Sequence, residues 1–169
     1  MSNEYDVSLF GDAGFDYTDQ ERANLTLIKA YRAAKIGDRK SFLAPGFRRR
    51  RVGLKHINEL WPLPADFVPV ESSPGGDPVS GGMDDKSIGN RINTFVHLTA
   101  KGNLVWGVFR VEGTHTGDIA GLGPTNREVD LTEAAMWRVE DRLITDAWYF
   151  GDELGLLISL GVQIPEDAL

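Results

Sequence analysis

The chain has no cysteine among its 169 residues. This absence excludes a disulfide framework, thiolate zinc ligation and a cysteine nucleophile. No apolar run approaches the roughly 18 residues needed to cross a bilayer. The first ten residues carry Glu4 and Asp6 and lack the basic stretch and apolar core of a secretory signal. We therefore expect a soluble, cytoplasmic protein.

Positive charge is also scarce. The chain holds 18 Lys and Arg against 25 Asp and Glu, which gives a formal net charge of −7. Nucleic-acid binding depends on cationic side chains that displace counterions from phosphates, and docking on anionic lipid has the same requirement. We expect neither nucleic acid nor a membrane as a partner. The 3 histidines form no i, i+4 pair, so we also expect no metal site.

The first third of the chain is predicted to be helical. The length and apolar content fit one domain over 1–169. Thr18 and Glu21 form a capping box, and apolar side chains follow at helical spacing, which predicts a helix over 19–36. Asp38 is placed to cap a second, short helix that runs through Leu43.

Two segments follow that do not read as regular structure. Four consecutive arginines at 48–51 form either a solvent-facing basic run, the reading favoured in an acidic chain, or an anion-binding lip over a pocket. Proline and glycine then concentrate at 62–82. Because proline removes a backbone donor and glycine adds backbone freedom, a loop or lid is expected over about 62–90.

The second half of the chain is predicted to be a sheet. Alternating side chains and turn residues define four strands, and a helix over 153–160 closes the chain; the strands are Ile92–Thr99, Leu104–His115, Glu128–Val139 and Leu143–Phe150. Helices followed by an antiparallel meander indicate the α+β class.

Strand parity selects the candidate acid–base residues. One face of the third predicted strand is apolar apart from Glu133, and it comprises Val129, Leu131, Glu133, Ala135, Trp137 and Val139. A carboxyl among apolar groups is costly to ionise, which favours a raised pKa suited to a general acid or base. The alternative is a salt-bridged carboxylate or one at the rim of the sheet.

Two further strands contribute candidates. His115 extends an apolar face of its strand, and His97 lies in the strand before; each is either a donor to substrate or a satisfied core or rim side chain. Parity groups Tyr149 with Leu143, Thr145 and Ala147. If the sheet curls around a pocket, Tyr149 and Glu133 both point into it.

Several motifs in order carry a family resemblance. The runs Gly113–Gly117, Gly121–Arg127 and Trp137–Ile144, followed by Trp148, Asp152 and Leu160-Gly161, resemble the SnoaL-like polyketide cyclase / ester cyclase family. Upstream, Gly37-Asp38 and Ser41–Phe47 are similar to the family's first two helices. The resemblance implies the nuclear transport factor 2-like fold, a cone of N-terminal helices on a strongly curved antiparallel sheet that encloses an apolar pocket. It also implies a homodimer.

The expected function is cofactor-free acid–base chemistry on a small apolar or aromatic, polyketide-like molecule: a cyclisation, dehydration, isomerisation or lyase step. Glu133 is the predicted general acid–base, and Tyr149 and His115 are predicted to donate to an oxyanion or leaving group. Predicted binding residues are Trp137, Trp106, Arg127, His97 and Asp152, although Asp152 reads more simply as a helix N-cap. The positions that carry the family's acid–base pair read Ala147 and Tyr149 here, so the alternative is a non-catalytic small-molecule-binding domain of the same fold.

Overall fold

The computed structural model describes residues 15–51, 87–119 and 122–163, without the side chains of Ile36 and Arg51. The predicted loop or lid therefore lies outside the described residues, except for 87–90. The elements, in chain order, are α1 (Asp19–Ala33), the 3₁₀-helix η2 (Ile36–Phe42), β1 (Leu43–Arg51), β2 (Ile88–Lys101), β3 (Leu104–His115), β4 (Glu128–Glu140), β5 (Leu143–Gly151) and α3 (Glu153–Ser159).

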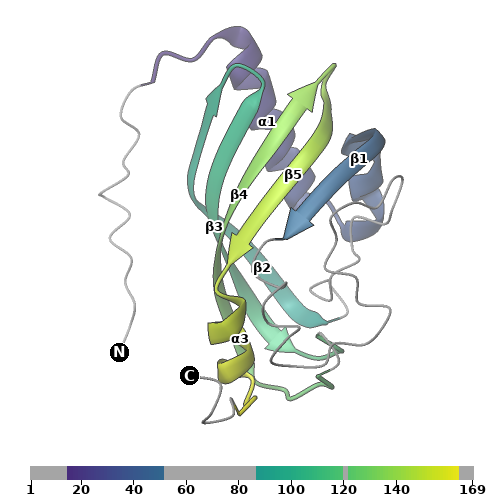
Figure 1. Cartoon of the computed structure of the whole chain (residues 1–169), viewed down its shortest axis with the longest axis vertical. Helices are drawn as coiled ribbons and strands as arrows, with labels where there is room; N and C mark the ends of the chain where they lie inside the picture. The colour runs from purple at the N-terminus through teal and green to yellow at the C-terminus, as the bar shows by residue number, and fades with distance from the viewer. Residues whose placement is uncertain (1–14, 52–86, 120–121, 164–169) are drawn as a thin grey trace.

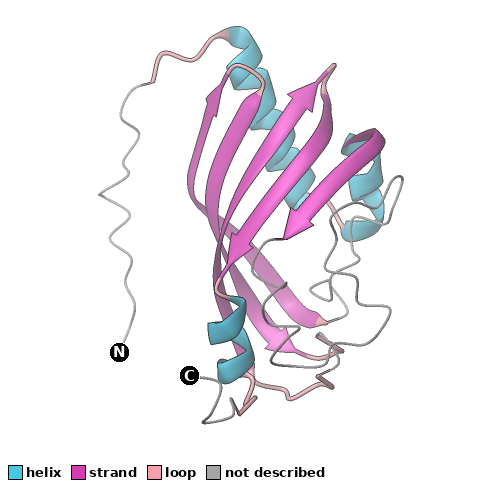
Figure 2. Ribbon diagram, in the orientation of Figure 1, coloured by secondary structure: helices cyan, strands magenta, loops and turns pink. Residues whose placement is uncertain are grey.

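The strands form one five-stranded sheet in the order β1-β5-β4-β3-β2. From β2 to β5, consecutive strands pair antiparallel, and β1 pairs parallel with β5 at one edge. The strands are long and curl, and α1 lies against one face of the sheet, here called the inner face (Figure 1). Helices cover only part of this sheet, which stays open rather than closing into a barrel (Figure 2). The predicted α+β class is confirmed.

Alternation along the strands sorts side chains between the inner face and the opposite, outer face. On β3 and β4 the buried side chains follow the predicted parity, from Val105 to His115 and from Val129 to Val139. On β5 the prediction is wrong for the first residues. A register shift opposite Arg138 and Val139 inserts an extra residue, so that Ile144 is buried instead of Thr145.

Residues 43–51 form a strand that the sequence analysis did not predict. The helix expected through Leu43 is the 3₁₀-helix η2, and the chain then continues directly into β1. Gly46 has a φ of 79° inside this strand, next to a register shift between β1 and β5. The partner strand β5 comes about a hundred residues later, and no local pattern in the sequence reveals it.

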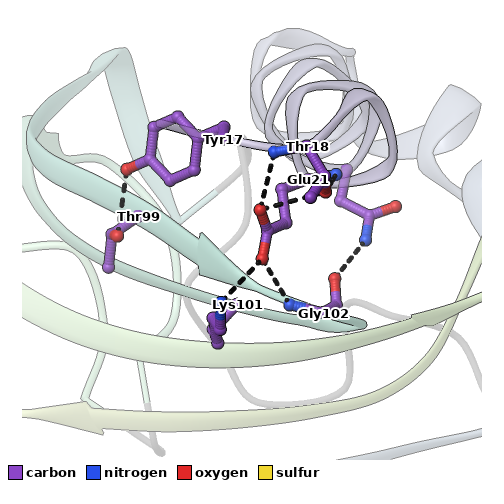
Figure 3. Close-up of polar contacts among 7 residues, drawn as sticks. Tyr17, Thr18, Glu21, Thr99, Lys101 and Gly102 are labelled. Atoms are coloured by element: carbon purple, nitrogen blue, oxygen red, sulfur yellow. Dashed lines mark hydrogen bonds and ion pairs between the residues drawn. The ribbon is translucent and has the colours of Figure 1, made fainter. Parts of the chain in front are cut away.

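The N-terminus of α1 is tied to the hairpin between β2 and β3 (Figure 3). The predicted capping box is present: Thr18 Oγ1 accepts from the Glu21 N–H at 3.2 Å, and Glu21 accepts from the Thr18 N–H at 2.8 Å. The other carboxylate oxygen of Glu21 accepts from the Gly102 N–H at 2.9 Å and lies 3.8 Å from Lys101 Nζ. The hydrogen bonds from Gly102 and Thr18 lower the pKa of Glu21 from 4.5 to about 2.

The ends of α3 are held by two predicted site residues. Asp152 Oδ1 accepts from the Gly155 N–H at 2.8 Å and is the N-cap, as its sequence position favours. At the other end, Arg127 Nη1 donates to the Ser159 carbonyl oxygen at 3.2 Å. A cation is favourable at a helix C-terminus. Both side chains therefore position α3. Among the described residues, no helix is long and apolar enough to cross a membrane.

Candidate functional site

Three predicted site residues are neighbours on the inner face. In the register of β4 and β5, Ala135 faces Tyr149 and Glu133 faces Gly151, so Tyr149 lies diagonally between Glu133 and Trp137. The side chains of Glu133, Tyr149 and Trp137 are 2%, 5% and 0% exposed. We call these three residues the inner row.

The hydroxyl of Tyr149 anchors a polar contact inside the aromatic core. Trp137 Nε1 donates to this oxygen at 3.2 Å, and the two rings meet edge to face with their centroids 6.0 Å apart. Phe109 packs against Trp137 at a centroid distance of 6.2 Å. Aromatic contacts of this kind restrict ring rotation, so the Tyr149 hydroxyl is held in one place.

Tyr31 approaches Tyr149 from α1. Burial raises the pKa of Tyr31 above its ordinary value of 10.0, and the charge and hydrogen bonding of the neighbouring Tyr149 raise it further, while Arg32 and Arg39 act in the opposite direction. Tyr31 therefore stays protonated at neutral pH and keeps a proton to donate. Two donors, the indole of Trp137 and the phenol of Tyr31, meet the Tyr149 oxygen.

Glu133 lies in the middle of β4. Its register partners are Phe109 on β3 and Gly151 on β5, and its side chain is nearly inaccessible to solvent. Tyr149 on β5 lies two residues from Gly151, the register partner of Glu133 on that strand. The carboxyl group of Glu133 and the phenol of Tyr149 therefore come from neighbouring positions of the sheet.

His115 does not join the inner row. It lies six positions beyond Phe109 on β3, which is about 20 Å along the strand at roughly 3.3 Å per residue. Its Nδ1 accepts from the Thr125 N–H at 3.2 Å and lies 2.9 Å from Thr125 Oγ1. The neutral ring therefore carries its proton on Nε2, which is buried and has no hydrogen-bond partner within the described segments.

Two other predicted residues lie on the outer face. Trp106 faces Met136 in the register of β3 and β4, and it is 47% exposed. His97 pairs with Val108, which has the same parity as Trp106. Trp106 and His97 are thus on the opposite side of the sheet from the inner row.

The outer face carries a cavity of about 160 Å³; its lining residues are Arg48, Arg50, Leu104, Met136, Arg138, Asp146 and Trp148. Arg48 Nη2 lies 2.6 Å from Asp146 Oδ1, and the guanidinium of Arg50 lies 4.9 Å from the ring centroid of Trp148. In the arginine run, alternation therefore turns Arg48 and Arg50 to the outer face. Both side chains are exposed and line this cavity.

Two residues of α1 that lie on the inner face were not predicted as site residues. Tyr31 and Arg32 are both buried there, and with Ile28 they follow the i, i+3, i+4 spacing of a helix face. That spacing was a usable signal for Tyr31. Arg32 carries no such signal, because an arginine beside an apolar stripe is normally solvent-facing.

The inner face therefore gathers a carboxyl group, two phenols, an indole N–H and a guanidinium. A carboxyl and a phenol side by side can transfer a proton and hydrogen-bond an oxygen of a bound molecule. Within the described residues, no group of three or more His, Cys, Asp or Glu side chains is arranged to hold a metal ion.

A helix packed on a curled, open and mostly antiparallel sheet is the architecture of the nuclear transport factor 2-like folds. A protein of that class from Burkholderia thailandensis E264 shares the architecture with a TM-score of 0.57 and 17% identity, over 83% of this chain and 98% of that one.

Residues 87–160 match the family model described as SnoaL-like polyketide cyclase. This stretch spans β2 to α3, and over it the predicted resemblance to the SnoaL-like family is confirmed. No curated protein matches the chain.

Two solved structures described as proposed polyketide cyclases share the fold. One is a proposed SnoaL-like polyketide cyclase from Jannaschia sp. CCS1, with a TM-score of 0.65 and 15% identity over 89% of this chain and 99% of that one. The other is IdmH, a proposed polyketide cyclase from Streptomyces antibioticus, with a TM-score of 0.56 and 23% identity over 82% of this chain and 99% of that one.

Proposed function

We propose that this protein is a cofactor-free enzyme that performs acid–base chemistry on a small apolar or aromatic, polyketide-like molecule, in a lyase or isomerase step such as cyclisation or dehydration. The observation that carries the proposal is the inner row, which sets the carboxyl group of Glu133 beside the anchored phenol of Tyr149 in the aromatic core. The match of residues 87–160 to the SnoaL-like family supports the same direction.

Glu133 is the proposed general acid–base. Its carboxylate takes a proton from a carbon next to a substrate carbonyl, and the carboxylic acid then returns that proton to another substrate atom. The electron pair of the broken C–H bond moves onto the carbonyl oxygen as an enolate. Burial of Glu133 supports this role, because a site shielded from water strengthens the interactions that stabilise the developing charge.

Tyr149 is the proposed donor to the enolate oxygen. Trp137 donates to the Tyr149 oxygen, and Tyr31 keeps its proton. With donors on its oxygen, Tyr149 can direct its own O–H toward the substrate, and the same donors stabilise charge that reaches the phenol. In comparable sites the loss of one such donor slows the reaction by roughly 10²- to 10³-fold.

The experiment measures proton exchange directly, so it needs no natural substrate. 2-Acetylnaphthalene is incubated with the protein in D₂O, and deuterium incorporation at its methyl carbon is followed by NMR. We expect the wild type to catalyse exchange, Glu133→Gln to abolish it and Tyr149→Phe to slow it by about 10²-fold or more. Glu112→Gln is the matched control, because Glu112 pairs with Arg110 on the outer side of β3. Undiminished exchange in Glu133→Gln refutes the assignment.

One observation favours a second candidate, a non-catalytic binding domain of the same fold. Ala147 is fully buried on the inner face, at a position where the family resemblance implies an acid–base residue. A methyl group there contributes packing and no chemistry. Binding of 2-acetylnaphthalene by the wild type without any exchange would support this candidate over the enzyme.

We also propose that the outer face holds a second copy of the chain. Trp106 and Phe150 are large apolar side chains exposed on this face, with Trp148 in ring contact with Phe150. Ion pairs such as Arg110–Asp130, with 2.6 Å contacts, lie beside them. A surface with apolar and oppositely charged groups can pack against its own copy about a two-fold axis.

A further inference from the structure

Arg32 is buried on the inner face, although arginine side chains are rarely buried without a partner. It follows Tyr31 on α1 and is 6% exposed. Its guanidinium carbon lies 3.9 Å from the ring centroid of Phe109, which is a close cation–π contact. Phe109 is in turn the register partner of Glu133. One aromatic ring therefore separates the guanidinium from the inner row.

The hydrogen bonding of Arg32 is incomplete. Its Nη2 donates to Asn93 Oδ1 at 2.9 Å, and the same oxygen also accepts from Arg91 Nε at 3.3 Å. The Nε of Arg32 is buried and finds no acceptor within the described part of the chain. Because a guanidinium carries only donors, this N–H is a fixed donor inside the protein that an oxygen of another molecule can satisfy.

The charge of Arg32 is not balanced by a carboxylate within the described residues, where the ion pairs involve other arginines and lysines. A second guanidinium lies close by: Arg39 Nη2 donates to the Arg32 carbonyl oxygen at 3.2 Å, and Arg39 stacks over Tyr31. A buried charge without an opposite partner is costly. Acidic side chains are plentiful in this chain, which has 25 of them against 18 basic ones. None of those within the described residues pairs with Arg32.

We propose that Arg32 binds the carboxylate of the substrate, which makes the substrate class an aromatic or apolar carboxylic acid. The inference rests on the proposed function and adds a specificity residue to the same site. The carboxylate accepts from Nε–H and compensates the guanidinium charge, and guanidinium is the group best suited to carboxylate oxygens. The aromatic part of the molecule then lies beside Phe109 and Trp137, within reach of Glu133.

The test compares an acid with its neutral isostere. Isothermal titration calorimetry gives the affinity of the wild type for 2-naphthoate and for 2-naphthamide. We expect roughly 10- to 100-fold tighter binding of the acid, the ratio that one charge-assisted hydrogen bond supplies. In Arg32→Met this ratio should fall to about one, with little change in the affinity for the amide. Arg50→Met is the matched control, because Arg50 also lies over an aromatic ring, that of Trp148, but on the outer face.

A stability measurement separates recognition from packing. If the role of Arg32 is to bind an anion, the Tm of Arg32→Met should equal or exceed the wild-type Tm, because the substitution removes an uncompensated buried charge. Arg32→Lys should keep part of the acid preference. Equal wild-type affinity for the two compounds, binding of neither, or an acid preference that survives in Arg32→Met overturns the proposal.

The two proposals fail separately, because binding needs no turnover. Acid preference without proton exchange at the methyl carbon of 6-acetyl-2-naphthoate, which carries both the ketone and the carboxylate, would count against the enzyme and leave Arg32 as an anion-binding residue. Exchange without acid preference would count against Arg32 alone.

Discussion

Replacing Tyr149 with phenylalanine removes a single oxygen from the inner face and tests the network around it. Trp137 Nε1 loses the acceptor that lies 3.2 Å away, and Tyr31 loses its neighbouring hydroxyl. Both donors are buried. An unpaired buried donor costs roughly 1–3 kcal/mol, so two of them should lower the free energy of unfolding by about 2–6 kcal/mol. In a chain of this size, that loss corresponds to a decrease in Tm of roughly 4–24 °C.

Urea denaturation of four proteins measures the effect: the wild type, Tyr149→Phe, Tyr31→Phe and the double variant. The double variant removes both phenols of the pair, so it should lose about 1 kcal/mol less than the sum of the single losses. Tyr17→Phe is the matched control, because its hydroxyl makes one half-buried contact, 3.0 Å from Thr99 Oγ1. A Tyr149→Phe variant as stable as the wild type, or strictly additive losses, would refute the network.

Three further predictions use other parts of the molecule. Glu21→Gln should lower Tm at pH 7, because folding lowers the pKa of Glu21 from 4.5 to about 2. The stabilisation by the Glu21 carboxylate is complete above pH 4.5 and is lost as the pH falls toward 2. Thermal melts of the variant and the wild type should therefore converge near pH 2. Gly113→Ala would place a Cβ 2.7 Å from a backbone oxygen, and urea denaturation should show a loss of about 1–3 kcal/mol, whereas Gly123→Ala meets no atom within 4 Å and serves as control. Trp106→Glu should be a monomer by light scattering; a monomeric wild type would contradict the proposed dimer.

The parts of the fold that depend on local sequence were predictable. The capping box at Thr18 needs only residues three apart, and the alternation in β3 and β4 needs only neighbouring positions. These patterns placed Glu133 and Trp137 on one face. The buried position of Tyr149 also followed, because the register shift in β5 lies before it.

The parts that depend on distant partners were not predictable. β1 pairs with a strand from the other end of the chain, and its arginines read as a surface run until Asp146 and Trp148 are seen beside them. Arg32 is similar, because only Phe109 and Asn93 on the sheet show why a charged side chain is buried there. Strand parity indicated that His115 is buried. Its separation from Glu133 along the sheet could be known only from the pairing register of β3 and β4.

The parallel edge of the sheet has a consequence for the order of folding. Arg48 pairs with Asp146, 98 positions later, whereas the connections between consecutive strands from β2 to β5 have 12 residues or fewer. Closing a long loop costs more chain entropy than closing a short one, and contacts between distant residues slow folding. We therefore expect the hairpins to collapse first and β1 to dock last. Phe47, which β1 brings into the core, would then be buried only in the last step of folding.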